Sequence, residues 1–162
     1  MMTAAQYVSL IVEPTLEEFR QNVDDLRRGM LASMAVLHVV DFVMQNREAT
    51  PKAGDDAVAA FKKRMAGVQW GFDTVNLFAL ASKHGALRNP QGFDIGKHMV
   101  AAPAFADVMV IDGSFLGDEI GGITVEVEPT VYVNLLEALD ATMALYRAEF
   151  SEALEASQST TP

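Results

Sequence analysis

The sequence predicts a mainly α-helical domain, in which a bundle of four to five helices carries one antiparallel β-hairpin before the C-terminal helix. Two observations lead to this fold class. From residue 15 to residue 84, apolar residues recur every three or four positions, which is the spacing of one helix face. From residue 105 the apolar period shortens to two, as in a half-buried strand, and a helical period returns after Pro129.

The length and composition indicate one small domain. The chain has 162 residues, half of them hydrophobic, which suits a single core. We assign residues 1–156 to this domain, with the hairpin at about 105–128, and residues 157–162 to a disordered polar tail. The first apolar run, Tyr7 to Val12, is too short for a signal peptide or a membrane span, and the chain has no cysteine. We therefore expect a cytoplasmic protein that does not enter a membrane.

The first half of the expected bundle contains its central helix. Residues 1–12 read as an extended lead-in, and Thr15 opens a helix as the first residue of a capping box with Glu18. Gly29 marks a bend or a break in that helix. Between Met30 and Met44 the sequence is apolar on nearly every face, which predicts that this part is buried.

Two shorter helices and the hairpin follow a polar loop at residues 46–54. Asp55 or Asp56 caps the third expected helix, and Gly67 ends it. A fourth helix is expected over residues 69–84, because Gly85 stands where a C-terminal cap glycine belongs. Residues 105–112 and 123–128 form the predicted strands of the hairpin, and the final helix is expected after Pro129.

The net charge of −10 is confined to one part of the chain. Residues 1–98 hold 11 acids and 11 bases, whereas residues 99–162 hold 11 acids and only one base, Arg147. Because binding to a phosphate backbone needs clustered cations, we do not expect direct nucleic-acid binding. The acidic half is either a solubilising surface or a surface that binds a protein partner.

His38 and Asp41 form the first candidate site. They are three residues apart, so they project from the same side of a helix, and their neighbours are apolar. A carboxylate in such surroundings needs a partner. The pair is either a satisfied polar pair that fixes how the helix packs, or an oriented imidazole that acts as an acid, a base or a ligand.

His84 is the centre of the second candidate site. Lys83 and His84 end the fourth expected helix, where cations stabilise the helix dipole without any further function. The alternative is a cleft in which both residues, together with Arg88, face His38 and Asp41. Asp73 and Asn76 lie eleven and eight residues before His84, so both can share its side of the helix.

Other motifs that carry chemistry are absent from the sequence. The three histidines are far apart in sequence, and no pair has the spacing of a metal site. There is no Walker A, GxGxxG or GxSxG sequence. We therefore expect no metal and no cofactor.

Two segments resemble motifs of a group of small bacterial proteins that is similar to a branch of the HEPN (higher eukaryotes and prokaryotes nucleotide-binding) superfamily. The first is an H-x-x-D-aromatic helix and the second is an N-A-x-K-H helix, within a likeness that covers residues 13–150. The segments that carry the likeness are residues 37–42, with His38, Asp41 and Phe42, and residues 76–88, with Asn76, Lys83 and His84. The resemblance implies a helical bundle that often dimerises and that acts in toxin–antitoxin, phage-defence or RNA-processing systems.

The resemblance also implies a specific chemistry for catalytic members, which are metal-independent ribonucleases. In them four to six residues separate an arginine from the catalytic histidine that follows it; the arginine steadies the phosphate, and the histidine transfers protons. In this chain, the corresponding positions before His84 are Leu77, Phe78 and Ala79, and no histidine has an arginine in that window. We therefore expect a non-catalytic domain that works through protein interaction, as a homodimer.

Two alternatives stay open. One is a degenerate RNA-directed phosphate-transfer enzyme, with His84, Lys83, His38 and Asp41 as catalytic residues and Asn76, Asp73 and Arg88 as binding residues. The other is an acidic inhibitor that mimics nucleic acid, which requires a continuous band of acids. The acids in that band would be Asp107, Asp118, Glu119, Glu126, Glu128, Glu137 and Asp140.

Overall fold

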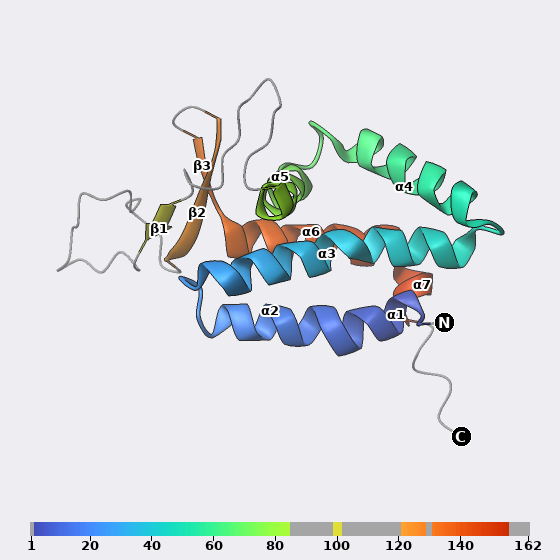
Figure 1. Cartoon of the computed structure of the whole chain (residues 1–162), viewed down its shortest axis with the longest axis horizontal. Coiled ribbons are helices and arrows are strands. Elements are labelled where there is room, and N and C mark those ends of the chain that lie inside the picture. The colour runs from blue at the N-terminus through green and yellow to red at the C-terminus, as the bar shows by residue number, and fades with distance from the viewer. Residues whose placement is uncertain (1, 85–98, 102–120, 129–130, 156–162) are drawn as a thin grey trace.

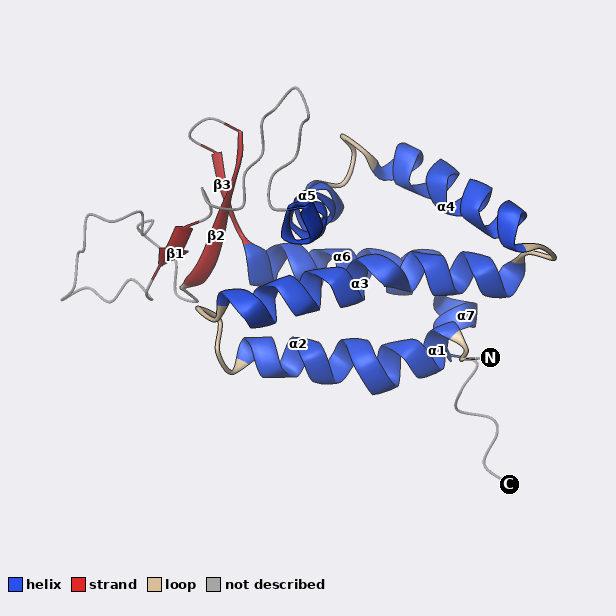
Figure 2. Cartoon of the chain, viewed as in Figure 1, coloured by secondary structure: helices blue, strands red, loops and turns tan. Residues whose placement is uncertain are grey.

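The protein is a helical bundle with a small sheet at one end, as a computed structural model of the chain shows (Figure 1). The structure describes residues 2–84, 99–101, 121–128 and 131–155. Helices α3 (Leu26–Arg47) and α6 (Leu135–Glu149) lie at the centre, and α5 (Trp70–His84) crosses both. The fold is mainly helical with an antiparallel hairpin before the C-terminal helix, as predicted (Figure 2).

The N-terminal segment differs from the expected extended lead-in. It is one continuous helix made of α1 (Ala4–Tyr7), a π-helical turn η1 (Val8–Val12) and α2 (Glu13–Arg20). Thr3 caps it, because its Oγ1 accepts the Gln6 N–H at 3.1 Å while the Gln6 Oε1 accepts the Thr3 N–H at 3.0 Å. Thr15 is therefore inside the helix, where its hydroxyl donates to the Ile11 carbonyl at 2.6 Å.

The π-turn lies one residue before Pro14, and it contains Val8 and Val12, two of the buried residues of this helix. Pro14 has no N–H to donate to the carbonyl of Leu10, which would be its α-helical partner. The α-helical bond pattern is therefore interrupted at this turn in any case.

The chain breaks at residues 21–25, a few residues before the position expected from Gly29. Asp25 caps α3 by accepting the Arg28 N–H at 3.1 Å. Gly29 itself is buried inside α3, at a close approach between helices and sheet. A Cβ added there would lie 2.8 Å from Ile123 Cδ1 and 3.0 Å from Leu135 Cδ2.

Helix α4 (Pro51–Met65) begins earlier than expected, so the loop before it is shorter. Thr50 caps it by accepting the Ala53 N–H at 3.3 Å, and Pro51 occupies the first turn, where its missing N–H costs nothing. Asp55 and Asp56 are consequently inside the helix. The predicted end at Gly67 is confirmed, with a φ of 72°, and α5 begins at Trp70, within one residue of the predicted start.

The sheet contains β1 (Met99–Ala101), β2 (Gly122–Glu128) and β3 (Val131–Asn134) in the order β1-β2-β3, all antiparallel. The predicted strand at 123–128 is confirmed as β2, whereas the predicted strand at 105–112 lies outside the described residues. We expected a helix directly after Pro129, but residues 131–134 pair with β2 first. Asn134 then caps α6, because its Oδ1 accepts the N–H groups of Leu136 at 2.9 Å and Glu137 at 3.3 Å.

The start of β2 is joined to the turn between α2 and α3. The Ile123 N–H donates to the Val23 carbonyl at 3.0 Å. Gly122 has a φ of 94°, and a Cβ there would lie 2.7 Å from the Val23 carbonyl oxygen. This backbone bond positions the sheet against the helices.

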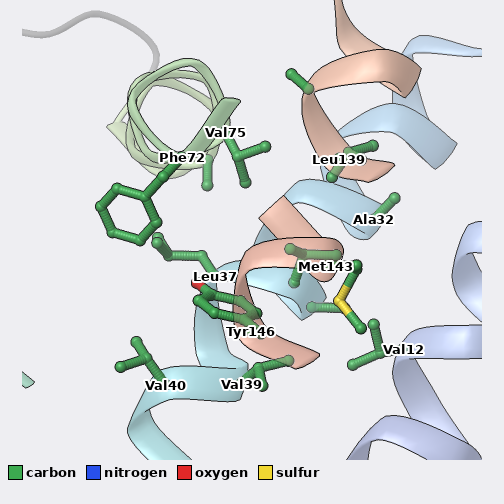
Figure 3. Close-up of a cluster of buried hydrophobic side chains, with 14 of the residues drawn as sticks. Val12, Ala32, Leu37, Val39, Val40, Phe72, Val75, Leu139, Met143 and Tyr146 are labelled. Carbon is green, nitrogen blue, oxygen red and sulfur yellow. The ribbon is translucent and has the colours of Figure 1, made fainter. Parts of the chain in front are cut away.

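The core lies between α3, α5, α6 and the N-terminal helix (Figure 3). Nine residues of α3 are buried, which confirms the expected central helix. Among the described residues, α3 is also the one helix long and apolar enough to cross a membrane by length and composition, and half of that stretch is buried inside the protein. The last helix is interrupted at Phe150 and continues as α7 (Ser151–Glu155).

Candidate functional site

His38 and Asp41 form the pair that the sequence predicted. His38 Nδ1 lies 2.6 Å from Asp41 Oδ2, and Lys62 Nζ of α4 approaches Asp41 Oδ1 at 3.9 Å. The His38 side chain is 60% exposed and that of Asp41 is 31% exposed. The imidazole of His38 is therefore exposed on α3, whereas the half-buried carboxylate of Asp41 also contacts α4 through Lys62.

The position of the pair follows from the helical repeat of α3. The buried residues before and after His38, among them Leu37, Val39 and Val40, point toward the core. His38 and Leu31 are seven residues apart, two helical turns, and both are on the opposite side. The apolar neighbours in the sequence thus do not surround the pair in space.

The chemistry available to the pair is that of an oriented imidazole. A carboxylate against Nδ1 holds the ring in one orientation and directs Nε2 away from Asp41. In such an arrangement the exposed nitrogen can accept a proton or a hydrogen bond. The exposed ring can also contact another molecule directly.

The negative charge of Asp41 affects the pKa of two buried tyrosines, Tyr7 and Tyr146. Burial raises the pKa of Tyr7, and the negative charge of Asp41 raises it further. The Tyr7 hydroxyl donates to the Ala35 carbonyl at 3.1 Å, and its ring stacks on Phe42 at 4.0 Å. Both contacts fix the N-terminal helix against α3.

Tyr146 of α6 is the second of these tyrosines. Burial, and to a smaller extent Asp41, raise the pKa of this phenol well above its ordinary value. Its ring lies in the core near Phe72 and Leu37 (Figure 3). Its hydroxyl is buried and has no hydrogen-bond partner among the described residues.

The second candidate site is only partly described. Lys83 is exposed at the end of α5, while the side chain of His84 and all of Arg88 lie outside the described residues. Asp73 Oδ2 accepts the Gly67 N–H at 2.8 Å, so this carboxylate holds the turn between α4 and α5. Asn76 is half-buried, one turn further along α5. A shared cleft of His38 and His84 therefore stays a prediction.

The acids of α6 do not form an unbroken acidic surface. Asp140 pairs with Arg20 at 2.6 Å, and Glu149 pairs with Arg64 at 2.9 Å. Arg147, the one base of the acidic half, pairs with Glu13 at 3.6 Å. Acids interleaved with bases of the first half weigh against a nucleic-acid mimic on this helix. Of the other acids in the expected band, the side chains of Glu126 and Glu128 and all of residues 107, 118 and 119 lie outside the described residues.

In the part of the chain that the structure describes, no three histidine, aspartate or glutamate side chains come together as a group that could hold a metal ion. Asp41 instead contacts a group of opposite sign, Lys62.

Comparisons of the chain with protein-family models, with curated proteins and with solved structures give no match. The resemblance to HEPN proteins therefore stays a prediction from the two motifs.

The structure adds residues that the sequence analysis did not single out. Five residues lie along the outward side of α3, which we call the α3 face: the exposed Arg27, Leu31 and His38, and the half-buried Met34 and Asp41. They follow one another at intervals of four, three, four and three residues, which is the spacing of a seam between two helices. This spacing is visible in the sequence, but it was not recognised as an exposed face because the residues between these positions are apolar.

Proposed function

We propose that the chain is a protein-interaction domain that binds its partner through the α3 face. The observation that supports this most is the exposure of Leu31, which is 42% accessible in the second turn of the central helix. Its neighbours on the face are the half-buried Met34 and the exposed His38. Exposed apolar residues rimmed by polar ones are typical of contact surfaces between proteins.

The charges of the α3 face also favour a protein partner over a nucleic acid. The face has a cation, Arg27, at one end and an anion, Asp41, at the other. A phosphate backbone would require cations along the whole length. A protein surface can complement both signs at once.

The proposal is tested with a photo-crosslinking amino acid at position 31, in cells that express the full chain. Val68, which is 71% exposed in the turn between α4 and α5, provides the matched control position. We expect an adduct from position 31 that purified wild-type protein competes away and that the Leu31→Lys variant does not. Equal labelling from positions 31 and 68, or an adduct that neither competitor affects, would contradict the proposal.

The second candidate function is phosphate transfer on RNA, and the geometry of the His38–Asp41 pair favours it. A 2.6 Å contact to Asp41 leaves an exposed imidazole oriented for proton transfer. The test incubates the protein with single-stranded and structured RNA, and compares wild type with His38→Ala and Lys83→Ala. Cleavage that depends on His38 would support this function, and no cleavage above the buffer rate would exclude it for these RNAs.

A further inference from the structure

We infer that the partner of the α3 face is a second copy of this chain, bound with the two α3 helices antiparallel across a twofold axis near Met34. This inference rests on the proposed interaction function and specifies its partner. It depends on the order of charges and apolar residues along the face.

The first step is the geometry of a twofold axis. In such an interface residue i of one copy meets residue j of the other, and residue j meets residue i. Arg27 and Asp41 lie at equal distances of seven residues on either side of Met34. An antiparallel pair centred on Met34 therefore brings Arg27 of each copy opposite Asp41 of the other. The two contacts are about 21 Å apart along the helix.

The second step is the availability of these charges. Arg27 is exposed and forms no ion pair with any of the described residues. Asp41 is partly exposed, and its Oδ1 is engaged only loosely, by Lys62 at 3.9 Å. A carboxylate has room for several donors, so Asp41 can accept a guanidinium and keep its bond to His38.

The third step is the centre of the interface. The axis places Met34 against Met34 of the other copy, and Leu31 beside His38 of the other copy. An antiparallel helix pair with this spacing buries both apolar residues and the face of the imidazole. The part of Leu31 that is exposed in the monomer, 42% of the residue, then becomes a packing contact.

Two other groups of exposed apolar residues lie on the helices and turns of the protein. Leu10 and Ile11 in the π-turn, and Val68 and Trp70 in the turn before α5, are 41–71% exposed. Glu13, which follows Leu10 and Ile11, already pairs with Arg147, and the charges that flank Val68 and Trp70, Arg64 and Asp73, are already engaged by Glu149 and by the Gly67 N–H. The α3 face is therefore the surface whose own pattern identifies its occupant.

The test is a charge swap measured by analytical ultracentrifugation of the full chain. Arg27→Asp makes the face acidic at both ends, and Asp41→Arg makes it basic at both ends. We expect the wild type to dimerise, and each variant alone to dimerise at least about tenfold more weakly, because like charges then meet twice. An equimolar mixture of the two variants should form a heterodimer, since each acidic end then meets a basic end.

Two charge reversals away from the face serve as matched controls. Lys63→Asp and Asp56→Arg change exposed residues of α4 by the same amounts and should leave dimerisation unchanged. Circular dichroism establishes that each variant is folded. Single variants that dimerise as well as the wild type, or a mixture that stays monomeric, would overturn the inference.

A second measurement does not depend on changing Asp41. The chain has no cysteine, so Met34→Cys introduces a single thiol close to the inferred axis. Mild oxidation should convert this variant to a disulfide-linked dimer, whereas Lys52→Cys, on exposed α4, should stay monomeric. Equal crosslinking at both positions would count against the α3 pair.

These outcomes separate the inference from the proposed function. A wild type that is monomeric at every concentration, with a competed adduct to a different protein at position 31, overturns the second copy as partner and leaves the interaction function standing. A monomeric wild type without any competed adduct removes both.

Discussion

The hydroxyl of Tyr146 is buried without a hydrogen-bond partner among the described residues, whereas that of Tyr7 donates to the Ala35 carbonyl at 3.1 Å. An unpaired buried hydroxyl destabilises a core, and a paired one contributes about 1 kcal/mol. We expect Tyr146→Phe to leave the free energy of unfolding unchanged or raise it by about 1 kcal/mol. Tyr7→Phe should lower it by about 1 kcal/mol. Urea unfolding of both variants measures the difference, and a loss in Tyr146→Phe would reveal a hydrogen bond to that hydroxyl.

The same two tyrosines predict how stability depends on alkaline pH. Burial raises the pKa of both phenols, so the folded protein holds their protons above the ordinary value of about 10. Their contribution is fully present below pH 10 and is lost as pH rises toward their folded pKa values. Each group then costs up to about 1.4 kcal/mol per pH unit. Urea unfolding at pH 9 and pH 11 should show this decline in the wild type and a shallower one in the Tyr7→Phe/Tyr146→Phe double variant.

At the residue level, the sequence predicted contacts within a helix better than contacts between helices. The spacing of three residues sufficed to pair His38 with Asp41. The approach of Lys62 to the same carboxylate depends on how α4 lies against α3, and no local pattern contains that information. The exposure of His38 was also missed, because apolar neighbours in sequence point to other sides of the helix.

At the level of the elements, Gly29 allows α3 to approach the start of α6 and the sheet. An alanine there would gain about 1 kcal/mol of helix propensity, but its Cβ would meet Ile123 and Leu135, which are 1% and 0% exposed and cannot move aside. We expect Gly29→Ala to lower the free energy of unfolding by about 1–2 kcal/mol net. Thermal and urea denaturation measure this loss.

Gly54 provides the matched control, because it is also a buried helical glycine. The nearest atoms to a Cβ at Gly54 belong to the amide end of Gln45, which can rotate away at the loss of its bonds to Asp55 and to the Pro51 carbonyl. The gain in propensity and the lost bonds nearly cancel, so the change should stay within about 1 kcal/mol. Equal losses in both variants would mean that the core around Gly29 can adapt.

The boundaries of a helix could be predicted where a residue type fits only one kind of position. Gly67 is such a residue, because glycine adopts a positive φ easily and most other residues do not, and it separates α4 from α5. The T-x-x-E pattern at Thr15 occurs both at the start of helices and inside them, and in this chain it lies inside a helix. The strand at 131–134 was missed because four residues are too few to show a period, and its partner β2 decides its structure.

At the level of the whole molecule, Gly122 joins the sheet to the helical bundle. A residue other than glycine would be strained there, because the backbone φ is 94°. Its Cβ would also lie 2.7 Å from the Val23 carbonyl oxygen, a backbone atom that cannot rotate away. We expect Gly122→Ala to cost about 2–4 kcal/mol, from strain and overpacking together. Urea unfolding measures the loss, and faster hydrogen exchange at the Ile123 amide should accompany it. A variant with an unchanged exchange rate at Ile123 would show that the sheet is held by other contacts.

The overall architecture could be predicted because the spacing of apolar residues within a short stretch of sequence distinguishes a helix from a strand. The mainly helical class, the hairpin before the last helix and the buried central helix all rest on such periods. The order β1-β2-β3 and the bond from Ile123 to Val23 join segments far apart in sequence, so they depend on the packed whole. The α3 face lies between these cases, since its spacing is local but its exposure depends on where the neighbouring helices lie.

The π-turn at Val8–Val12 has a consequence for changes in chain length. A turn closed by i→i+5 bonds contains one residue more than an α-helical turn, so losing one residue there restores an α-helix without rotating the flanking parts. Deleting the exposed Leu10 should therefore leave Tyr7 on Phe42 and Phe19 in the core, with a nearly unchanged melting temperature. Deleting Glu17 from the regular part would rotate Phe19 by about 100° relative to Leu16 and unfold the helix from the bundle. The first helix thus tolerates the loss of a residue at one defined turn, and a deletion scan across residues 9–18 would locate it.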